Sequence, residues 1–326
     1  MAKRIDERKQ GTGAVVGLLT SQGRSFATYG HISLGGPEAT PDTVFEIGSI
    51  TKVFTALLLA DMVERGEVLP NDPVRKFLPA SVTVPSRGGK QITLVDLATQ
   101  TSGLPRDSLK VDLDSPTSAY AGYTAPQLYA FVGGYRLERD PGSKYEYSNV
   151  GFGLLGHALA LRAGMSYEEL LRRRIFEPLG MTSTTITLNA EQRSRRATGY
   201  NGKLLAVQPW TGGVLDPTGS ILSTAADMLK FGSAMVDPNS PLKPAFARMT
   251  SVRRPSDGPR SDQVLGWGIF RLGPNELVGH SGGTLGFQTR LIVDLTRKRS
   301  VVAWINGQGE SVTDLVGMAL DRSSLQ

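Results

Sequence analysis

The run GHSGG at residues 279–283 has the G-x-S-x-G form that presents a nucleophilic serine on a tight turn. If Ser281 were the nucleophile of an α/β-hydrolase, an acid and then a histidine would follow it in the chain. No histidine follows residue 281. Of the three that precede it, His280 is the adjacent residue, His157 lies in an apolar stretch typical of packed side chains, and His31 has no obvious carboxylate partner. A histidine-dependent triad on Ser281 is therefore disfavoured.

A second stretch places a serine and a lysine at the start of a predicted helix. Ser49 and Lys52 are three residues apart, so a helix would put the ammonium group one turn above the hydroxyl on the same face. The helix N-terminus adds free N–H groups and a positive potential, which stabilise an oxyanion and favour an uncharged lysine. The spacing alone is weak evidence, because about one chance match is expected in a chain of this size.

A third stretch, Tyr147-Ser148-Asn149, opens another predicted helix. A phenol beside a lysine can be drawn toward the phenolate and carry a proton during a reaction. The structural alternative is a core aromatic at Tyr147 and a cap at Asn149. Near the end of the chain, the glycines after Ser281 would leave backbone N–H groups free to bind a carbonyl, with Ser281 as part of the wall.

Strand patterns at both ends of the chain and helical patterns between them must position these stretches. Strands are predicted at 14–20 and 25–29, and again at 265–272, 276–280, 287–294 and 300–306. Helices are predicted at 49–65, 150–162 and 311–319, with further starts capped by Thr93, Ser166 and Thr224. The pattern indicates an α+β fold, in which one antiparallel sheet is built from both termini, covered by helices and interrupted by a helical lobe.

The chain of 326 residues contains no cysteine, which excludes disulfides, thiolate nucleophiles and zinc-finger sites. Its net charge of +6 comes from scattered basic runs, a pattern that disfavours nucleic acid as a partner. No apolar run approaches the roughly 20 residues of a membrane span, and the first residues lack a signal-peptide core. We expect a soluble protein, cytoplasmic as the sequence stands, and periplasmic or secreted if a leader has been removed.

Together with LATQTSGLP at 97–105 and PGSKYEYSNVGFGLLG at 141–156, the three stretches resemble the serine β-lactamase and penicillin-binding-protein superfamily. The most similar branch contains the class C β-lactamases, DD-peptidases and family VIII carboxylesterases. The resemblance extends from about Gly13 to Asn306. It implies a five-stranded antiparallel sheet flanked by helices. The sheet domain would comprise 1–75 and 205–326, the helical domain 76–204, and the active site would lie in the cleft between them.

The resemblance also implies roles for individual residues. Ser49 would be the acyl-accepting nucleophile, Lys52 its base or the relay to it, and Tyr147 a general base that later protonates the leaving group. The backbone N–H groups of Ser49 and Gly283 would form the oxyanion hole. The implied oxyanion and substrate-binding residues are Asn149, His280, Ser281, Gly282 and Gly283. Trp210 and Trp267 are candidates for the wall of an acyl pocket. No cofactor and no metal is implied.

Two positions depart from the family pattern. His280 stands where class C β-lactamases usually have lysine, and a neutral imidazole attracts a substrate carboxylate less strongly. Gln100 stands where many relatives have histidine. The first departure favours a carboxylesterase acting on small acyl esters, with weak β-lactam hydrolysis. A class C type β-lactamase and a DD-peptidase or D-amino-acid amidase remain alternatives.

A catalytically idle penicillin-recognising module of the same fold is the alternative from another functional class. It is disfavoured because Ser49, Lys52, Tyr147 and Asn149 are all present. The expected partner is a small ester, amide or β-lactam substrate. The oligomeric state is not predicted.

Overall fold

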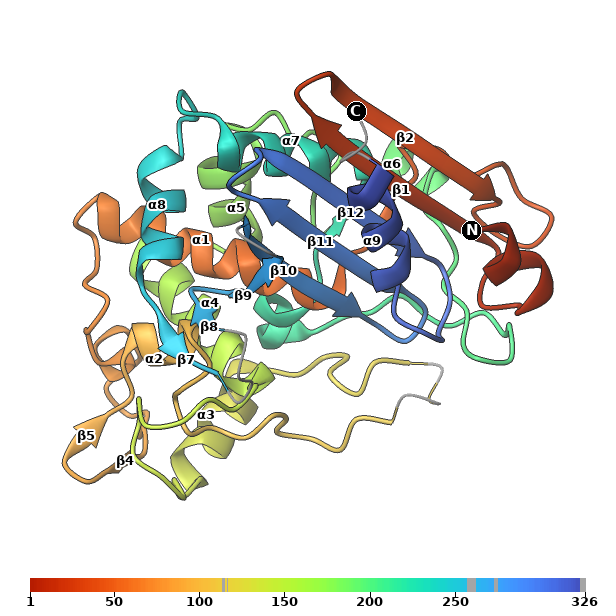
Figure 1. Ribbon diagram of the computed structural model, residues 1–326. Helices are drawn as coiled ribbons and strands as arrows, with labels where there is room; N and C mark the ends of the chain where they lie inside the picture. The colour runs from red at the N-terminus through yellow and green to blue at the C-terminus, as the bar shows by residue number, and fades with distance from the viewer. Residues whose placement is uncertain (113–114, 116, 257–261, 273–274, 323–326) are drawn as a thin grey trace.

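The computed structural model describes residues 1–112, 115, 117–256, 262–272 and 275–322. Its main sheet is antiparallel and joins the two ends of the chain, as predicted (Figure 1). β1 (Gly13–Thr20) pairs with β2 (Gly23–Gly30) on one side and with β12 (Arg299–Ile305) on the other, where Ala14 lies opposite Ile305. β11 (Gln288–Asp294) and β10 (Asn275–Gly283) continue the sheet.

The sheet formed by the described residues has eight strands, so the expectation of five was too low. The additional strands are β9 (Trp267–Leu272), β8 (Asp262–Val264) and β7 (Arg254–Pro255), which follow β10 in that order. β9 begins two residues later than the predicted strand at 265, because Leu265 and Gly266 form the turn that joins it to β8. Gly266 has a φ of +72°, a backbone conformation that suits glycine.

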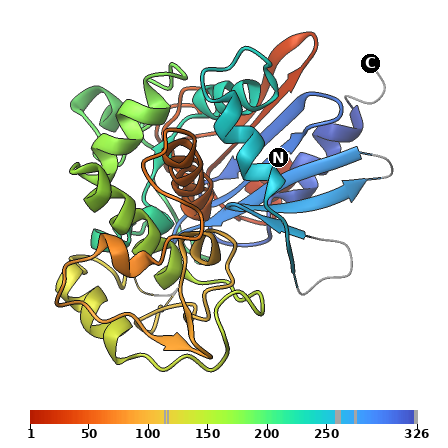
Figure 2. The ribbon, with the colours of Figure 1, turned by 90° about the vertical axis from the view of Figure 1, so that its left-hand side faces the viewer.

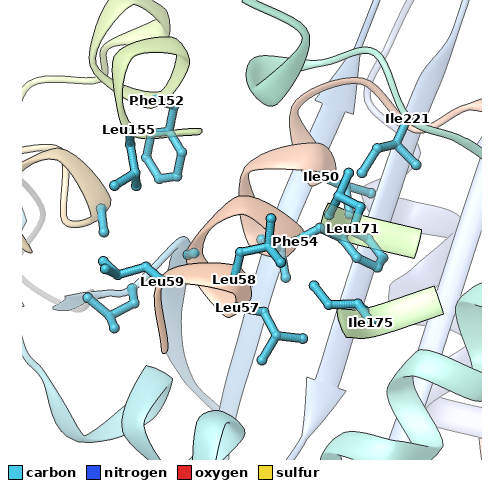
Figure 3. Packing of buried hydrophobic residues seen from close by; sticks show 14 of the residues in the cluster. Ile50, Phe54, Leu57, Leu58, Leu59, Phe152, Leu155, Leu171, Ile175 and Ile221 are labelled. Atoms are coloured by element: carbon cyan, nitrogen blue, oxygen red, sulfur yellow. The ribbon is translucent and has the colours of Figure 1, made fainter. Parts of the chain in front are cut away.

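Helix α1 (Thr51–Glu64) runs through the centre of the molecule, between the other helices and the sheet (Figure 2). A 3₁₀ turn, η2 (Gly48–Ile50), leads into it. Phe54, Leu57 and Leu58 are completely buried and meet residues from several other elements (Figure 3). A helix that is buried on all sides is held in place by its neighbours. This packing therefore sets the position of the N-terminal end of α1.

Layers of helices cover both faces of the sheet. Trp304 and Val302 of β12 belong to the large core that includes α1 and α7 (Ala225–Val236). Val301 and Ala303 belong instead to a smaller core under α9 (Thr313–Arg322). Because alternate residues of a strand point to opposite faces, α7 and α9 lie on opposite sides of β12.

Further helices lie mainly to one side of the sheet. They are α2 (Leu94–Ala98), α3 (Ala125–Gly134), α4 (Asn149–Ala163), α5 (Tyr167–Leu171), α6 (Ala190–Ser194) and α8 (Lys243–Ser251). The side chains of Thr93 and Ser166 cap α2 and α5, as predicted. The sequence analysis did not predict α3 and α8. Among the described helices, none is both long and apolar enough to cross a membrane. The domain boundaries proposed from sequence remain a prediction.

The backbone before η2 packs directly against the end of β10. A Cβ atom added at Gly282 would lie 1.9 Å from the carbonyl oxygen of Ile47. A Cβ added at Gly48 would lie 2.7 Å from the backbone nitrogen of Gly283. Both distances are too short for a side chain, so glycine at these positions permits the contact that joins η2 to the sheet.

Replacing Gly282 by alanine should therefore lower stability, because the new methyl group must push the two backbones apart. We expect a loss of about 1–3 kcal/mol, as for other overpacked sites. Gly283→Ala is the matched control, since its Cβ would lie 3.5 Å from the Gln288 side chain, an ordinary van der Waals distance. Thermal unfolding of both variants checks this, and equal midpoints would contradict it.

Candidate active site

The structure places Lys52 beside Ser49, as the three-residue spacing predicts. Lys52 Nζ lies 3.1 Å from Ser49 Oγ and donates a hydrogen bond to the carbonyl oxygen of Thr218 at 2.7 Å. The side chain is completely buried. Within the part of the chain that the structure describes, no carboxylate forms an ion pair with Lys52. Thr218, which the sequence analysis did not single out, thus supplies its second polar contact.

Burial sets the protonation of Lys52. Removal from water lowers the pKa of the amine well below its usual value, and the positive charge of Arg106 lowers it further. The carboxylate of Asp107 opposes this effect. The neutral amine is therefore favoured far more than for an exposed lysine, and a neutral amine can accept the proton of the Ser49 hydroxyl.

Tyr147 and Asn149 are held by hydrogen bonds between two loops. Ser148 caps α4, since its side chain accepts from Gly151 N at 2.8 Å. Its backbone N–H donates to Gln100 Oε1 at 2.7 Å, and Asn149 N donates to the carbonyl oxygen of Arg106 at 2.7 Å. Gln100 thus positions the tyrosine loop, a role that the sequence analysis did not assign to it.

The phenol of Tyr147 completes a cluster with Ser49 and Lys52. Lys52 Nζ lies 4.9 Å from the centre of the Tyr147 ring. Burial raises the pKa of Tyr147, while a hydrogen bond from the Ser49 side chain and the charge of Arg106 act in the opposite direction. The net effect keeps the phenol protonated, so that it can donate a proton.

Residues 280–283 line the opposite wall of the cleft with a free strand edge. β9 pairs with β10 only as far as Gly279, and Thr284 N donates to Phe287 O where β10 turns into β11. Hydrogen-bonded and non-hydrogen-bonded pairs alternate in an antiparallel ladder. The N–H of Gly283 therefore points away from β11, toward the edge next to η2. Ser49 N–H belongs to the first turn of η2, whose donors have no partner inside the helix.

Ser281 and His280 have separate environments in this wall. Ser281 Oγ accepts a hydrogen bond from the Arg290 guanidinium at 2.5 Å. His280 Nδ1 lies 2.6 Å from the carbonyl oxygen of Ser281, so this nitrogen carries the ring proton. Burial and the charge of Lys52 lower the pKa of His280 to about 3. Its imidazole is therefore neutral at physiological pH.

One cleft of about 1000 Å³ brings the predicted residues together. The residues of the prediction that line it are Ser49, Tyr147, Asn149, His280, Ser281, Gly282 and Gly283. Trp210 also lines it, whereas Trp267 is completely buried in the core, so its candidacy as a pocket residue was wrong. Among the described residues no cluster of His, Asp and Glu is arranged to hold a metal ion.

Three charged residues of the cleft received no individual role from the sequence, although the segment 106–123 is predicted to border the cleft. Arg106 and Asp107 follow LATQTSGLP, and Arg290 stands in the otherwise apolar centre of β11. In the structure, Thr289 and Leu291 are buried while Arg290 is more exposed. A charged residue at an alternate position of a predicted strand was therefore the available signal for Arg290. Its position opposite Ser281 depends on strand register, which no local pattern shows.

Comparison with known proteins agrees with this geometry. The family model described as Beta-lactamase matches residues 1–323. The chain belongs to the beta-lactamase family. Its relatives include the D-alanyl-D-alanine-carboxypeptidase/endopeptidase AmpH of Escherichia coli, which is 32% identical over 85% of this chain and 75% of the relative. A beta-lactamase of Escherichia coli is 26% identical over 93% of this chain and 79% of the relative. The protein is thus a hydrolase of the serine β-lactamase and penicillin-binding-protein superfamily.

Solved structures share the fold. A class C beta-lactamase from Rhodobacter sphaeroides has a TM-score of 0.84 at 24% identity and is covered over 98% of its chain, with all of this chain aligned. A beta-lactamase/D-alanine carboxypeptidase from Yersinia pestis has a TM-score of 0.83 at 24% identity, with 98% of this chain and 95% of that one aligned. The predicted mixed fold, with an antiparallel sheet and flanking helices, is confirmed.

The environment of His280 leads to a pH prediction. Because its pKa is lowered to about 3, the ring gains its proton only as the pH falls through that value. The NMR signals of the His280 ring, assigned by their loss in His280→Asn, should stay constant between about pH 5 and 8. A midpoint near the ordinary value of about 6.5 would show that the imidazole is charged in part of this range.

Proposed function

We propose that the protein hydrolyses acyl bonds through an acyl-enzyme intermediate on Ser49. Lys52 Nζ, 3.1 Å away, takes the proton of the Ser49 hydroxyl while Oγ bonds to the acyl carbon. The negative charge that develops on the carbonyl oxygen is bound by the N–H groups of Ser49 and Gly283. This assignment rests on one observation above all: a buried lysine contacts a serine hydroxyl and has no carboxylate partner among the described residues.

Tyr147 carries the second proton transfer in this proposal. When the bond between the acyl carbon and the leaving group breaks, the phenol gives its proton to the leaving atom. The proton on Lys52 then restores the phenol, since both groups contact Ser49. Water attacks the acyl-enzyme next, and the same groups return the proton to Ser49. Asn149 contacts the substrate from the start of α4.

The substrate proposed is an acyl peptide that carries a carboxylate, of the D-alanyl-D-alanine type. Arg290 supports this choice, because it lines the cleft and forms no ion pair with any described carboxylate. Its guanidinium bonds Ser281 and stacks on Phe270 at 5.3 Å, which holds the charge beside the wall. Arg290 would thus supply the positive charge that His280 lacks. AmpH, 32% identical, is named for such a carboxypeptidase activity.

Hydrolysis of small acyl esters, the leading prediction from the sequence, is the second candidate. The neutral imidazole of His280 favours it, because an uncharged side chain at this position does not require a carboxylate on the substrate. Class C type β-lactam hydrolysis uses the same acylation step and stays an alternative. Rates on a D-alanyl-D-alanine peptide, a butyrate ester and a chromogenic cephalosporin separate the three activities.

Two serine variants test the nucleophile. Ser49→Ala should abolish ester hydrolysis and the mass increase that a bound β-lactam gives, because no acyl-enzyme can form. Ser281→Ala should keep a reduced rate, since the Ser281 hydroxyl bonds Arg290 and has no hydrogen bond to a base among the described residues. Steady-state rates and intact-protein mass measure both. An inactive Ser281→Ala beside an active Ser49→Ala would overturn the assignment.

A third variant tests the substrate class. Arg290→Ala should lower kcat/KM for the D-alanyl-D-alanine peptide roughly 10- to 100-fold, the effect of losing one charged hydrogen bond. Hydrolysis of a neutral butyrate ester should change little. Arg24→Ala, which removes the same charge from the exposed edge strand β2, is the matched control. An equal loss on both substrates would count against a carboxylate site at Arg290.

A further inference from the structure

A second arginine lies at the opposite side of the cleft from Arg290. The Arg106 guanidinium packs over the Tyr147 ring, with Cζ 4.9 Å from the ring centre. Lys52 Nζ lies at the same distance from that centre. The Tyr147 ring thus contacts one buried amine and one guanidinium at the cleft surface, and the guanidinium contact is favoured by the electrostatics of an aromatic face.

Asp107 ties Arg106 to the catalytic loop. Its Oδ2 lies 3.4 Å from Arg106 Nε, while Oδ1 accepts from Asn149 Nδ2 at 2.7 Å and from the Tyr120 hydroxyl at 3.1 Å. Because a carboxylate only accepts, Asn149 must turn its NH₂ group to Asp107. The Asp107 side chain is 18% exposed and that of Arg106 is 69% exposed, so the acid is the fixed member of the pair.

We propose that Arg106 is a positioning residue for acylation, which holds the Tyr147 ring by stacking and supplies a positive charge beside the Ser49–Lys52–Tyr147 cluster. Asp107 anchors the Arg106 side chain through their ion pair, and its negative charge opposes the effect of Arg106 on the cluster. This inference rests on the proposed function, because it assigns Arg106 a role in the proton transfer from Ser49 to Lys52.

The charges around Lys52 determine the direction in which each substitution moves the pH dependence of acylation. Arg106 lowers the pKa of Lys52, and Asp107 raises it. The other titratable groups that act on the cluster are Tyr145, beside Tyr147, and the neutral His280 on β10, while Arg290 faces His280. Because the free amine of Lys52 is the active form, acylation falls as the pH drops through the pKa of Lys52. Removing Arg106 should move this acidic limb to higher pH, and neutralising Asp107 should move it to lower pH.

The test is the pH dependence of Ser49 labelling by an alkyl fluorophosphonate, which reports acylation-type attack without a choice of natural substrate. The variants are Arg106→Gln, Arg106→Lys and Asp107→Asn. Lys110→Gln, a charge change at an exposed site further along the same loop, is the matched control. Intact-protein mass against time gives the labelling rate at each pH, and the unmodified protein provides the reference limb.

We expect Arg106→Gln to raise the midpoint of the acidic limb by about half to one pH unit, which is the effect of removing one partly screened charge near the amine. Asp107→Asn should lower the midpoint, whereas Arg106→Lys and Lys110→Gln should leave it in place. Shifts in the same direction for Arg106→Gln and Asp107→Asn, or none for Arg106→Gln, would overturn the inference. A displaced limb in Arg106→Lys would also overturn it. Absence of Ser49 labelling in the unmodified protein would instead reject the proposed function.

Discussion

The close approach of two backbone segments, residues 47–48 and 282–283, is the constraint on which the site depends. Ser49 follows one segment directly, and the free edge of β10 ends in the other. Glycine at 48 and 282 lets the two backbone segments meet without side chains between them. Gly48 also has a φ of +53°. The contact brings the start of η2 against the backbone of Gly283. In the proposed mechanism, the N–H groups of Ser49 and Gly283 would stabilise the developing oxyanion from this preformed contact.

A second consequence follows from the burial of α1. The helix is mainly apolar and is buried from Thr51 to Met62, so packing carries Lys52 into the interior together with its neighbours. Burial makes this amine favour its uncharged form, and its hydrogen-bond partners among the described residues are Ser49 and the Thr218 carbonyl. In the proposed mechanism this uncharged amine is the base. The same burial raises the pKa of Tyr147, so a proton acceptor and a proton donor sit next to one hydroxyl.

The other charged side chains of the cleft lie on its two walls. His280 is neutral, and the cation on its side comes from Arg290 on the neighbouring strand. On the other side Arg106 stacks on Tyr147, and Asp107 links it to Asn149. Gln100 fixes the same loop through Ser148. Each wall thus carries one guanidinium, and Ser49 lines the same cleft.

The sequence by itself determined the local features: the Ser49–Lys52 spacing on a helix, the caps at Thr93 and Ser166, the strands at both ends and the family. These depend on contacts within a few residues or on motifs in a known order. Tertiary structure alone decided that eight strands pair, that Trp267 is core, and that Arg106, Asp107 and Arg290 enter the cleft. Arg290 meets Ser281 through strand register, and Arg106 meets Tyr147 through the packing of two loops. Both contacts join residues far apart in the chain, so no pattern of neighbouring residues contains them.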